Sequence, residues 1–149
     1  MRLSRQVQYA LCGIFDLAYN GAGEPVRVQS IGARQGIPYP FLEQIFQRLR
    51  KAGLVRGKRG PGGGYTLSRA PDAISLREVC EAVEGRWDGL AIVDAREWSE
   101  SEHRPDFLWP DLAERMARAV GELRVSDVCR EAVKRSVKRD LPEPLDYQI

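Results

Sequence analysis

Residues 54–67 read Leu-Val-Arg-Gly-Lys-Arg-Gly-Pro-Gly-Gly-Gly-Tyr-Thr-Leu, and this stretch decides the fold of the chain. Two short apolar and basic runs flank a turn that contains four glycines and one proline. Glycine permits the positive φ angles of tight turns and proline fixes a bend, so the stretch predicts a β-hairpin. The hairpin carries the cations Arg56, Lys58 and Arg59, which is typical of contact with a polyanion.

Two other interpretations of this hairpin are weaker. A phosphate-binding loop needs Lys and then Ser or Thr directly after its glycines, whereas Tyr65 follows them here. A plain structural hairpin is the second alternative, and the sequence leaves it open. We interpret the hairpin as DNA-binding.

Charge is distributed unevenly along the 149 residues. Residues 27–70 contain nine Arg or Lys and a single acidic residue, Glu43, whereas residues 71–149 contain twelve basic and eighteen acidic residues. The overall formal net charge of +2 hides this contrast. A local excess of positive charge is typical of a nucleic-acid-binding surface, and the acidic remainder would keep the other half of the chain away from phosphates.

The sequence predicts a cytoplasmic protein without a membrane segment. No apolar run approaches the roughly 20 residues that span a bilayer, and no signal-peptide pattern occurs. The three cysteines Cys12, Cys80 and Cys129 are odd in number and far apart, so they predict no disulfide framework.

The segment before the hairpin predicts a helix-turn-helix unit. Helical spacing of apolar residues favours helices over residues 3–19, about 29–35 and about 39–52, with Gly36-Ile37-Pro38 as the turn between the last two. Together with the hairpin, these elements form a winged helix. The outer face of the third helix is polar, which suits either an ordinary solvated face or a recognition helix; it comprises Tyr39, Glu43, Gln44, Gln47, Arg48 and Lys51.

The second half of the chain predicts three more helices. A Ser75-x-x-Glu78 capping box opens a helix over residues 76–84, and residues 85–104 form a long loop. A fifth helix carries an apolar stripe, and a sixth runs from Val125 to about Arg139. Pro142 and Pro144 predict an extended, mobile tail.

The stripe on the fifth helix needs a partner. It includes Leu108, Leu112, Met116, Ala119, Val120 and Leu123. The helix either folds back onto the first helix or pairs with the same helix of a second chain. Two-fold dimers are the commonest oligomers, and helix-turn-helix proteins often bind palindromes as dimers, so we expect a homodimer.

Further motifs then point to a known family. They are Met1-Arg2-Leu3-Ser4, Tyr9-Ala10, Leu42-Glu43-Gln44-Ile45-Phe46, residues 49–55 (Leu-Arg-Lys-Ala-Gly-Leu-Val) and residues 59–65 (Arg-Gly-Pro-Gly-Gly-Gly-Tyr). They resemble the Rrf2 family of bacterial winged-helix transcriptional regulators. The likeness covers most of residues 1–84 and resumes at Leu108-Trp109 and Asp111-Leu112. It implies a mainly α fold with a small β-hairpin wing: a DNA-binding domain over 1–84, a sensor-type loop over 85–104, and dimerisation helices and a tail over 105–149.

The resemblance also implies a mode of DNA binding. A homodimer, acting as a repressor, would place two wings at a palindromic promoter site, with recognition helices in the major groove near Tyr39, Glu43 and Gln44. Glu43 would accept a hydrogen bond from a cytosine amino group, and Arg59 would enter a minor groove. The first-helix residues Arg2, Ser4 and Tyr9 would contact phosphates.

The chain departs from the family at the iron–sulfur site. Members that hold a [2Fe–2S] cluster carry three closely spaced cysteines between the fourth and fifth helices, but residues 85–107 contain none. His103 lies about where the last of those cysteines would fall, and one imidazole does not replace several thiolates. We therefore expect no cofactor of the usual kind.

Cys12 on the first helix leaves an alternative open. Some relatives combine ligands from the first helix of one chain with loop ligands of the other, so an atypical site could join Cys12 to His103 of the partner subunit. Cys12 could instead be a thiol that senses oxidants, or a small buried core residue. We interpret Cys80 and Cys129 as packing residues.

Two other functional classes have less support. An enzyme is not indicated, because there is no Cys/His pair close in sequence, no metal-binding helix motif and no phosphate loop. A protein-interaction module would not explain the cations of the wing. The sequence therefore predicts a DNA-binding transcriptional regulator.

Overall fold

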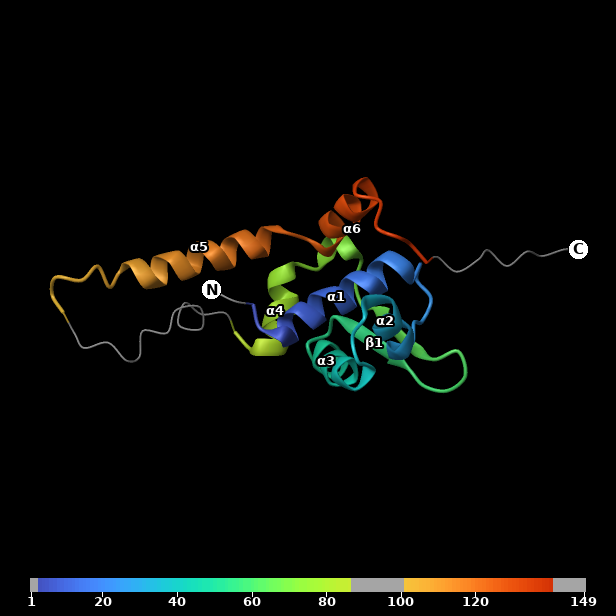
Figure 1. Cartoon of the computed structure of the whole chain (residues 1–149). Helices are drawn as coiled ribbons and strands as arrows, with labels where there is room; N and C mark the ends of the chain where they lie inside the picture. Colours follow the sequence, from blue (N-terminus) through green and yellow to red (C-terminus); the bar gives the residue numbers. More distant parts are fainter. Residues whose placement is uncertain (1–2, 87–100, 141–149) are drawn as a thin grey trace, which may run out of the picture.

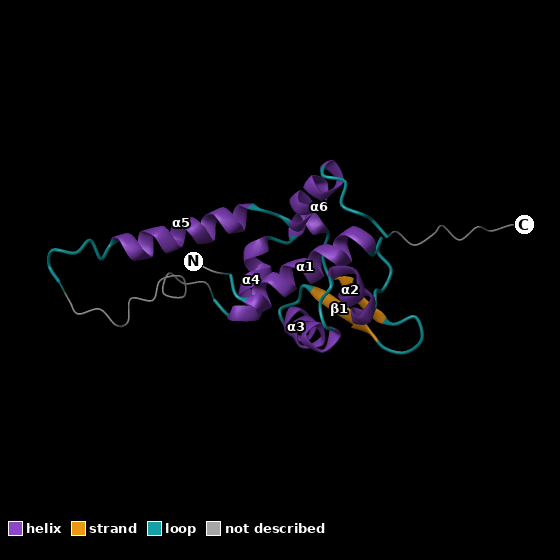
Figure 2. Cartoon of the chain, viewed as in Figure 1, coloured by secondary structure: helices purple, strands orange, loops and turns teal. Residues whose placement is uncertain are grey.

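In the computed structural model, residues 3–86 and 101–140 are described. Helices predominate, and one of them leads away from the rest of the chain (Figures 1 and 2). The elements in order are α1 (Arg5–Asn20), α2 (Val28–Gln35), α3 (Tyr39–Lys51), β1 (Val55–Lys58), β2 (Gly64–Leu67), η1 (Pro71–Ala73), α4 (Leu76–Glu84), α5 (Leu108–Glu122) and α6 (Val125–Lys134). The predicted winged helix-turn-helix is confirmed.

Helix α1 is the centre of the head, the name used here for α1–α4, the hairpin and α6. The Ser4 Oγ accepts a hydrogen bond from the backbone N–H of Val7 at 3.2 Å, so the helix begins at Arg5 rather than at Leu3. Helices α2, α3, α4 and α6 all pack against it. Its apolar face is therefore buried on several sides at once.

The turn between α2 and α3 contains the predicted glycine and proline in the expected roles. Gly36 adopts a left-handed backbone with φ of 67°, which ends α2, and Pro38 precedes the first residue of α3. The predicted inward stripe of α3 is buried in the common core and comprises Leu42, Ile45, Phe46 and Leu49. The rest of α3 is thereby directed outward.

The hairpin pairs Val55 with Leu67 and Lys58 with Gly64 in an antiparallel register. Val26 extends the sheet by a bridge to Tyr65, whose ring lies 5.0 Å from that of Phe46 on α3. The wing is therefore attached both to the segment before α2 and to α3.

The glycines of the turn have different roles. Gly60, Gly62 and Gly64 have positive φ, as expected, but Gly63 does not. Gly63 is needed for another reason, because a Cβ there would lie 2.4 Å from the carbonyl oxygen of Lys58. The turn was therefore predicted correctly, but the positive φ expected of its glycines does not apply to Gly63.

Helix α4 begins with the predicted capping box. The Glu78 carboxylate accepts from the Ser75 backbone N–H at 2.9 Å, and the Ser75 Oγ accepts from the Glu78 N–H at 3.1 Å. The link between α5 and α6 then pairs with this segment, since the N–H of Leu76 donates to the Leu123 carbonyl at 2.9 Å. This link fixes the point from which α5 leaves the head.

Helix α6 is shorter than predicted. It ends at Lys134 instead of continuing to about Arg139, and Ser136 has a positive φ of 58° that reverses the chain. Residues 137–140 then run back to the end of α1. Helical periodicity alone could not show this, because Val133 and Val137 fit the spacing of a continuing helix.

The apolar stripe of α5 is only partly free. Ala117 packs with Val7 and Cys80, and Val120 lies beside them, so one face of α5 is covered by the head. Leu112 is still 39% exposed and Leu123 48%. Contact with the first helix, one of the two alternatives for α5, is thus seen on the neighbouring face that includes Ala113 and Ala117, and pairing of the exposed stripe with a second chain stays a prediction.

Candidate nucleic-acid interface

The three cations of the wing are exposed to solvent. Arg56, Lys58 and Arg59 are exposed, and they lie on β1 and at the start of the glycine turn. Figure 1 shows the hairpin loop at the edge of the head, away from α5. Cations held in this way can approach a phosphate backbone without moving the core.

The outer face of α3 begins with aromatic and polar side chains. Tyr39 is 47% exposed, and Glu43 and Gln44 are exposed too. All three lie in the first half of the helix, which is the part that contacts base edges in helix-turn-helix proteins. The four buried positions of α3 keep this face outward.

Arg48 differs from the other predicted contact residues of α3. Its Nη1 donates to the side-chain oxygen of Gln6 at 2.9 Å and to the backbone carbonyl of Val83 at 3.2 Å. The guanidinium therefore links α3 to α1 and to the end of α4. Both bonds use Nη1, so a phosphate contact by Arg48 would use Nη2 or Nε.

The start of α1 lies beside α3. Arg2 lies outside the described residues, and the Ser4 oxygen caps the helix. Tyr9 is half-buried, its ring centroid is 6.5 Å from that of Phe41 on α3, and the guanidinium of Arg5 lies 6.0 Å from the Tyr9 ring. Aromatic and cationic groups of α1 and α3 thus meet at one surface.

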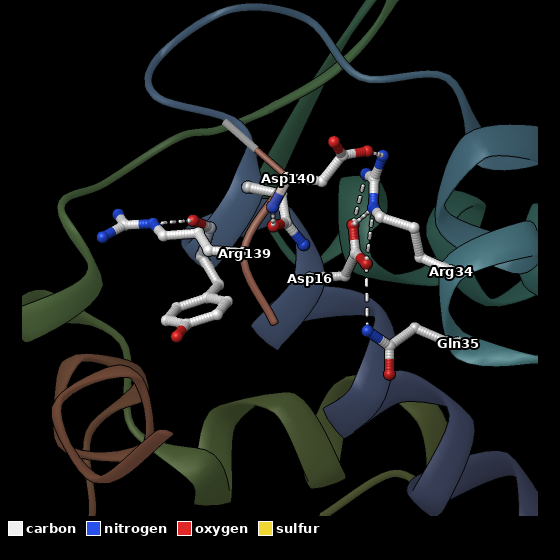
Figure 3. A network of polar contacts seen from close by, with 7 residues as sticks. Asp16, Arg34, Gln35, Arg139 and Asp140 are labelled. Carbon is white, nitrogen blue, oxygen red and sulfur yellow. Dashed lines mark hydrogen bonds and ion pairs between the residues drawn. The ribbon is translucent and has the colours of Figure 1, made fainter. Parts of the chain in front are cut away.

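A buried ion pair joins α1 to α2. The Asp16 side chain has no exposed surface and accepts hydrogen bonds from Arg34 Nη2 at 2.7 Å, Arg34 Nε at 3.0 Å and Gln35 Nε2 at 2.9 Å (Figure 3). The hydrogen bonds to Asp16 are the main reason that the pKa of Arg34 is raised above its ordinary value. This bidentate pair sets the position of α2 within the helix-turn-helix unit.

The end of the described chain contacts the same region. The Asp140 carboxylate lies 3.5 Å from Arg34 Nη1. The backbone N–H of Asp140 donates to the Asn20 side-chain oxygen at 2.7 Å. Arg139 donates to the Tyr19 carbonyl at 2.7 Å, and its guanidinium lies 4.9 Å from the Tyr19 ring (Figure 3). Residues 137–140 therefore hold the carboxyl end of α1 against α2.

Four of the predicted dimerisation residues lie at i,i+4 spacing along α5, and the fifth, Leu123, is the C-cap of the helix. Leu108, Met116 and Val120 are half-buried, and Leu112 and Leu123 are exposed. Met116 and Val120 lie at the border between this stripe and the face that contacts the head. The exposed leucines are available to a second chain.

The cysteines are poorly placed for thiolate chemistry. Burial raises the pKa of Cys12 and of Cys129, and it raises that of Cys80, which is fully buried, to about 11. A raised pKa lowers the fraction of reactive thiolate at neutral pH. These groups do not match the donor set of a [2Fe–2S] cluster, which needs converging thiolates, and residues 85–107 supply none.

His103 is exposed, and its backbone N–H donates to the Ser101 side chain at 3.3 Å. Within residues 3–86 and 101–140, no three metal-ligating side chains are grouped together. None of the helices in these same ranges is long and apolar enough to cross a membrane.

Sequence reasoning missed two features of this region. One is the Asp16–Arg34 pair, whose signal was an acidic residue within the buried arc of the first helix. The other is Phe41, a large apolar residue of α3 that is 57% exposed. The periodicity of α3 places Phe41 outside its buried stripe, and this signal was present in the sequence.

A winged helix-turn-helix with an exposed recognition helix and a cationic wing defines a class, the winged-helix transcriptional regulators. Residues 3–131 match the sequence model of the Rrf2 family, which is described as an iron-dependent transcriptional regulator. The chain belongs to the Rrf2 family.

Individual relatives agree with this assignment. The chain is 38% identical over 130 residues to the HTH-type transcriptional regulator IscR of Erwinia tasmaniensis, covering 86% of this chain and 78% of the relative. The solved structure of T. potens IscR has a TM-score of 0.72 at 28% identity, with 93% of each chain covered. That of CymR, the global cysteine regulator of B. subtilis, has a TM-score of 0.72 at 26% identity, covering 88% of this chain and 98% of the other.

Proposed function

We propose that the protein is a sequence-specific DNA-binding transcriptional regulator that acts as a homodimer, in the role of a repressor, at palindromic promoter sites in the cytoplasm. One observation carries this proposal: a cationic wing and an exposed recognition helix occur on a head from which a partly apolar helix leads away. Residues 1–84 form the DNA-binding domain, residues 85–104 the sensor-type loop, and residues 105–149 the dimerisation helices and tail. No catalytic role is assigned.

The recognition helix supplies the base contacts in this proposal. Glu43 accepts a hydrogen bond from a cytosine amino group, and Tyr39 and Gln44 lie on either side of it in the major groove. A carboxylate beside phosphates is repelled by them, so its exposure on a cationic surface favours base discrimination over affinity.

The wing and the start of α1 supply the contacts to the DNA backbone. Arg59 enters a minor groove, while Arg56 and Lys58 lie along phosphates. Arg2, Ser4 and Tyr9 contact the backbone on the other side of the recognition helix. Arg48 contributes mainly by fixing α3 to α1 and α4, as its hydrogen bonds indicate.

Dimerisation uses the exposed edge of α5. Leu112 and Leu123 expose apolar surface that a second α5 can cover, with Leu108, Met116 and Val120 completing the contact. A two-fold axis through this contact would present two heads to a palindrome.

The regulator works without the three-cysteine cluster in this proposal. Some relatives are named IscR, but the present chain has no cysteine in residues 85–107. The test is an absorption spectrum and iron analysis of protein purified without oxygen. A colourless, iron-free dimer is expected, and a stoichiometric cluster would contradict this part of the proposal.

The alternative is a redox-sensing regulator with an atypical iron–sulfur or thiol site at Cys12 and His103 of the partner subunit. Cys12 is favoured because it lies on α1, the helix that contacts α5 through Val7, although Cys12 itself packs against the main core. Its raised pKa argues against it. DNA binding by wild type and Cys12→Ser, each before and after mild peroxide, separates the two: a response that only wild type shows supports the alternative.

DNA binding itself is tested by selection from random duplexes. Wild-type protein should enrich a palindrome, and its affinity should fall with a log–log slope against salt of about −0.9 for each phosphate contacted. Glu43→Ala should return a motif with looser base preference at one position of each half-site. Failure to enrich any motif would contradict the proposed function, and an unchanged motif would remove Glu43 from base contact.

A further inference from the structure

Phe41 has an unusual position for a large apolar side chain. It lies in the first turn of α3, it is 57% exposed, and it belongs to the helix that carries Glu43 and Gln44. Burying a phenylalanine side chain stabilises a protein by roughly 1.5–3 kcal/mol, and this benefit is largely absent here. The ring is therefore available to a partner outside the chain.

Tyr9 of α1 supports the ring of Phe41. Its centroid lies 6.5 Å from that of Tyr9 with 37° between the planes, which is within the range of a tilted aromatic pair. Tyr9 is itself covered by Arg5, whose guanidinium lies 6.0 Å from the Tyr9 ring. Helix α1 thus contacts the ring of Phe41, and 57% of the residue stays exposed.

A small pocket opens at this point between α1 and α3. It has a volume of about 230 Å³ and is lined by Arg5, Gln6, Tyr9, Phe41, Gln44, Ile45 and Arg48. The lining combines aromatic and apolar side chains with two arginines and two glutamines. This combination matches a ligand that has an apolar group close to negative charges.

The edges of DNA bases in the major groove offer one such apolar group, the 5-methyl of thymine, and phosphates flank it on both sides. Phenylalanine is among the side chains that contact this methyl. Gln44 lies three residues after Phe41, so the two side chains share a face of α3 and would reach neighbouring base pairs. DNA is favoured as the partner because Phe41 shares α3 with Glu43 and Gln44 on the chain of a transcriptional-regulator family.

We propose that Phe41 reads a thymine in each half-site by contacting its 5-methyl group, with Tyr9 holding the ring in place. This inference rests on the proposed function, because it requires the recognition helix to lie in the major groove. It adds an apolar specificity contact to the polar contact at Glu43.

The test replaces thymine by deoxyuridine, one position at a time, in the selected palindrome. This substitution removes the methyl group and leaves the base pairing unchanged. Wild-type protein should lose roughly 3- to 10-fold in affinity at one position of each half-site. Phe41→Ala should bind the thymine and uracil duplexes equally, while Phe41→Leu should retain part of the discrimination.

Phe107→Ala is the matched control, since Phe107 is an exposed aromatic residue outside α3 that has no assigned DNA contact. It should keep the methyl discrimination. The inference is overturned if wild type shows no position of methyl sensitivity, or if Phe41→Ala keeps that sensitivity. Binding of the unmodified palindrome by wild type is scored separately, so a failure of the proposed function is distinguished from a failure of the Phe41 contact. Thermal unfolding of each variant establishes that the head is folded.

Discussion

The head and helix α5 differ in how far their large apolar residues are buried. In the head, Leu42, Phe46 and Leu49 have no exposed surface, and the residues left outside on α3 are mostly polar or charged. On α5 and at its C-cap, Leu112 and Leu123 stay exposed, although small residues of the helix are buried. From this contrast we expect that the core of the head is complete within one chain, whereas the exposed leucines near α5 are covered by a second chain.

The variant with the largest expected effect tests whether the exposed stripe of α5 is a dimer contact. Leu112→Lys places a charge in the dimer contact twice, once in each chain. The dimer dissociation constant should rise about 100-fold or more, equivalent to about 3 kcal/mol. Sedimentation equilibrium of wild type and variant measures this change.

Glu114→Lys is the control for Leu112→Lys. It adds the same side chain two positions further on, near the opposite side of the helix, where Glu114 pairs with Arg118 in an exposed ion pair. Its effect on dimerisation should be small, because exposed ion pairs contribute about 0–1 kcal/mol. Equal dissociation of both variants would show that the stripe is not the contact.

A second variant tests how much the buried Asp16–Arg34 pair stabilises the head. Asp16→Ala leaves the Arg34 guanidinium beside a buried site without its main acceptor, so it should lower the free energy of unfolding by about 3 kcal/mol. Urea unfolding followed by circular dichroism measures this. Asp140→Asn alters the exposed end of the same network and should cost less than about 1 kcal/mol. If the two variants were equally stable, the buried pair would not be what holds α1 to α2.

A third variant separates binding from folding. Arg59→Ala should weaken DNA binding by roughly 1–3 kcal/mol, because it removes a cation from the wing, while the dimer stays intact. Arg115→Ala removes an exposed cation from α5 and should leave DNA affinity within about twofold. Fluorescence anisotropy with labelled palindrome compares them. Equal affinities of wild type and Arg59→Ala would remove the wing from the mechanism.

The smallest effect concerns the capping box of α4. Burial alone would raise the pKa of Glu78, but hydrogen bonds from the Ser75 N–H and from Arg69 outweigh it and lower that pKa. The carboxylate therefore stabilises the fold above the unfolded-state pKa of about 4.3, and this contribution is lost as pH falls through the lower folded-state value. Glu78→Gln should cost about 1 kcal/mol or less at pH 7, since the side chain is 39% exposed.

Unfolding of wild type and Glu78→Gln at pH 7 and pH 3 checks this sign. The difference between them should shrink at the lower pH. A difference that grows on acidification would contradict the direction of the pKa shift.

Local chemistry explains which parts of the fold could be predicted. The capping box at Ser75, the Gly36 turn and the buried stripe of α3 each depend on residues a few positions apart, and all three were predicted correctly. The Asp16–Arg34 pair and the return of residues 137–140 depend on contacts between distant segments. Val137 has the spacing expected of a continuing α6, although residues 137–140 turn back to α1. The sequence pattern therefore does not distinguish a longer helix from the observed turn.

The candidate site divides in the same way. The wing cations and the outer face of α3 follow from sequence, because charge and periodicity determine both. The intramolecular hydrogen bonds of Arg48 could not be predicted, since their acceptors come from α1 and from the carbonyl of Val83. Which edge of α5 stays exposed was predicted only in part, because small residues rather than large ones pack against the head.

The central claim is that two heads joined through α5 bind one palindrome. Titration of the selected palindrome and of an isolated half-site with wild-type protein, combined with the mass of each complex, tests it most directly. The account predicts two chains on the palindrome and a much weaker complex with the half-site. One chain bound to each half-site, with equal affinity for the isolated half-site and for each half of the palindrome, would contradict it.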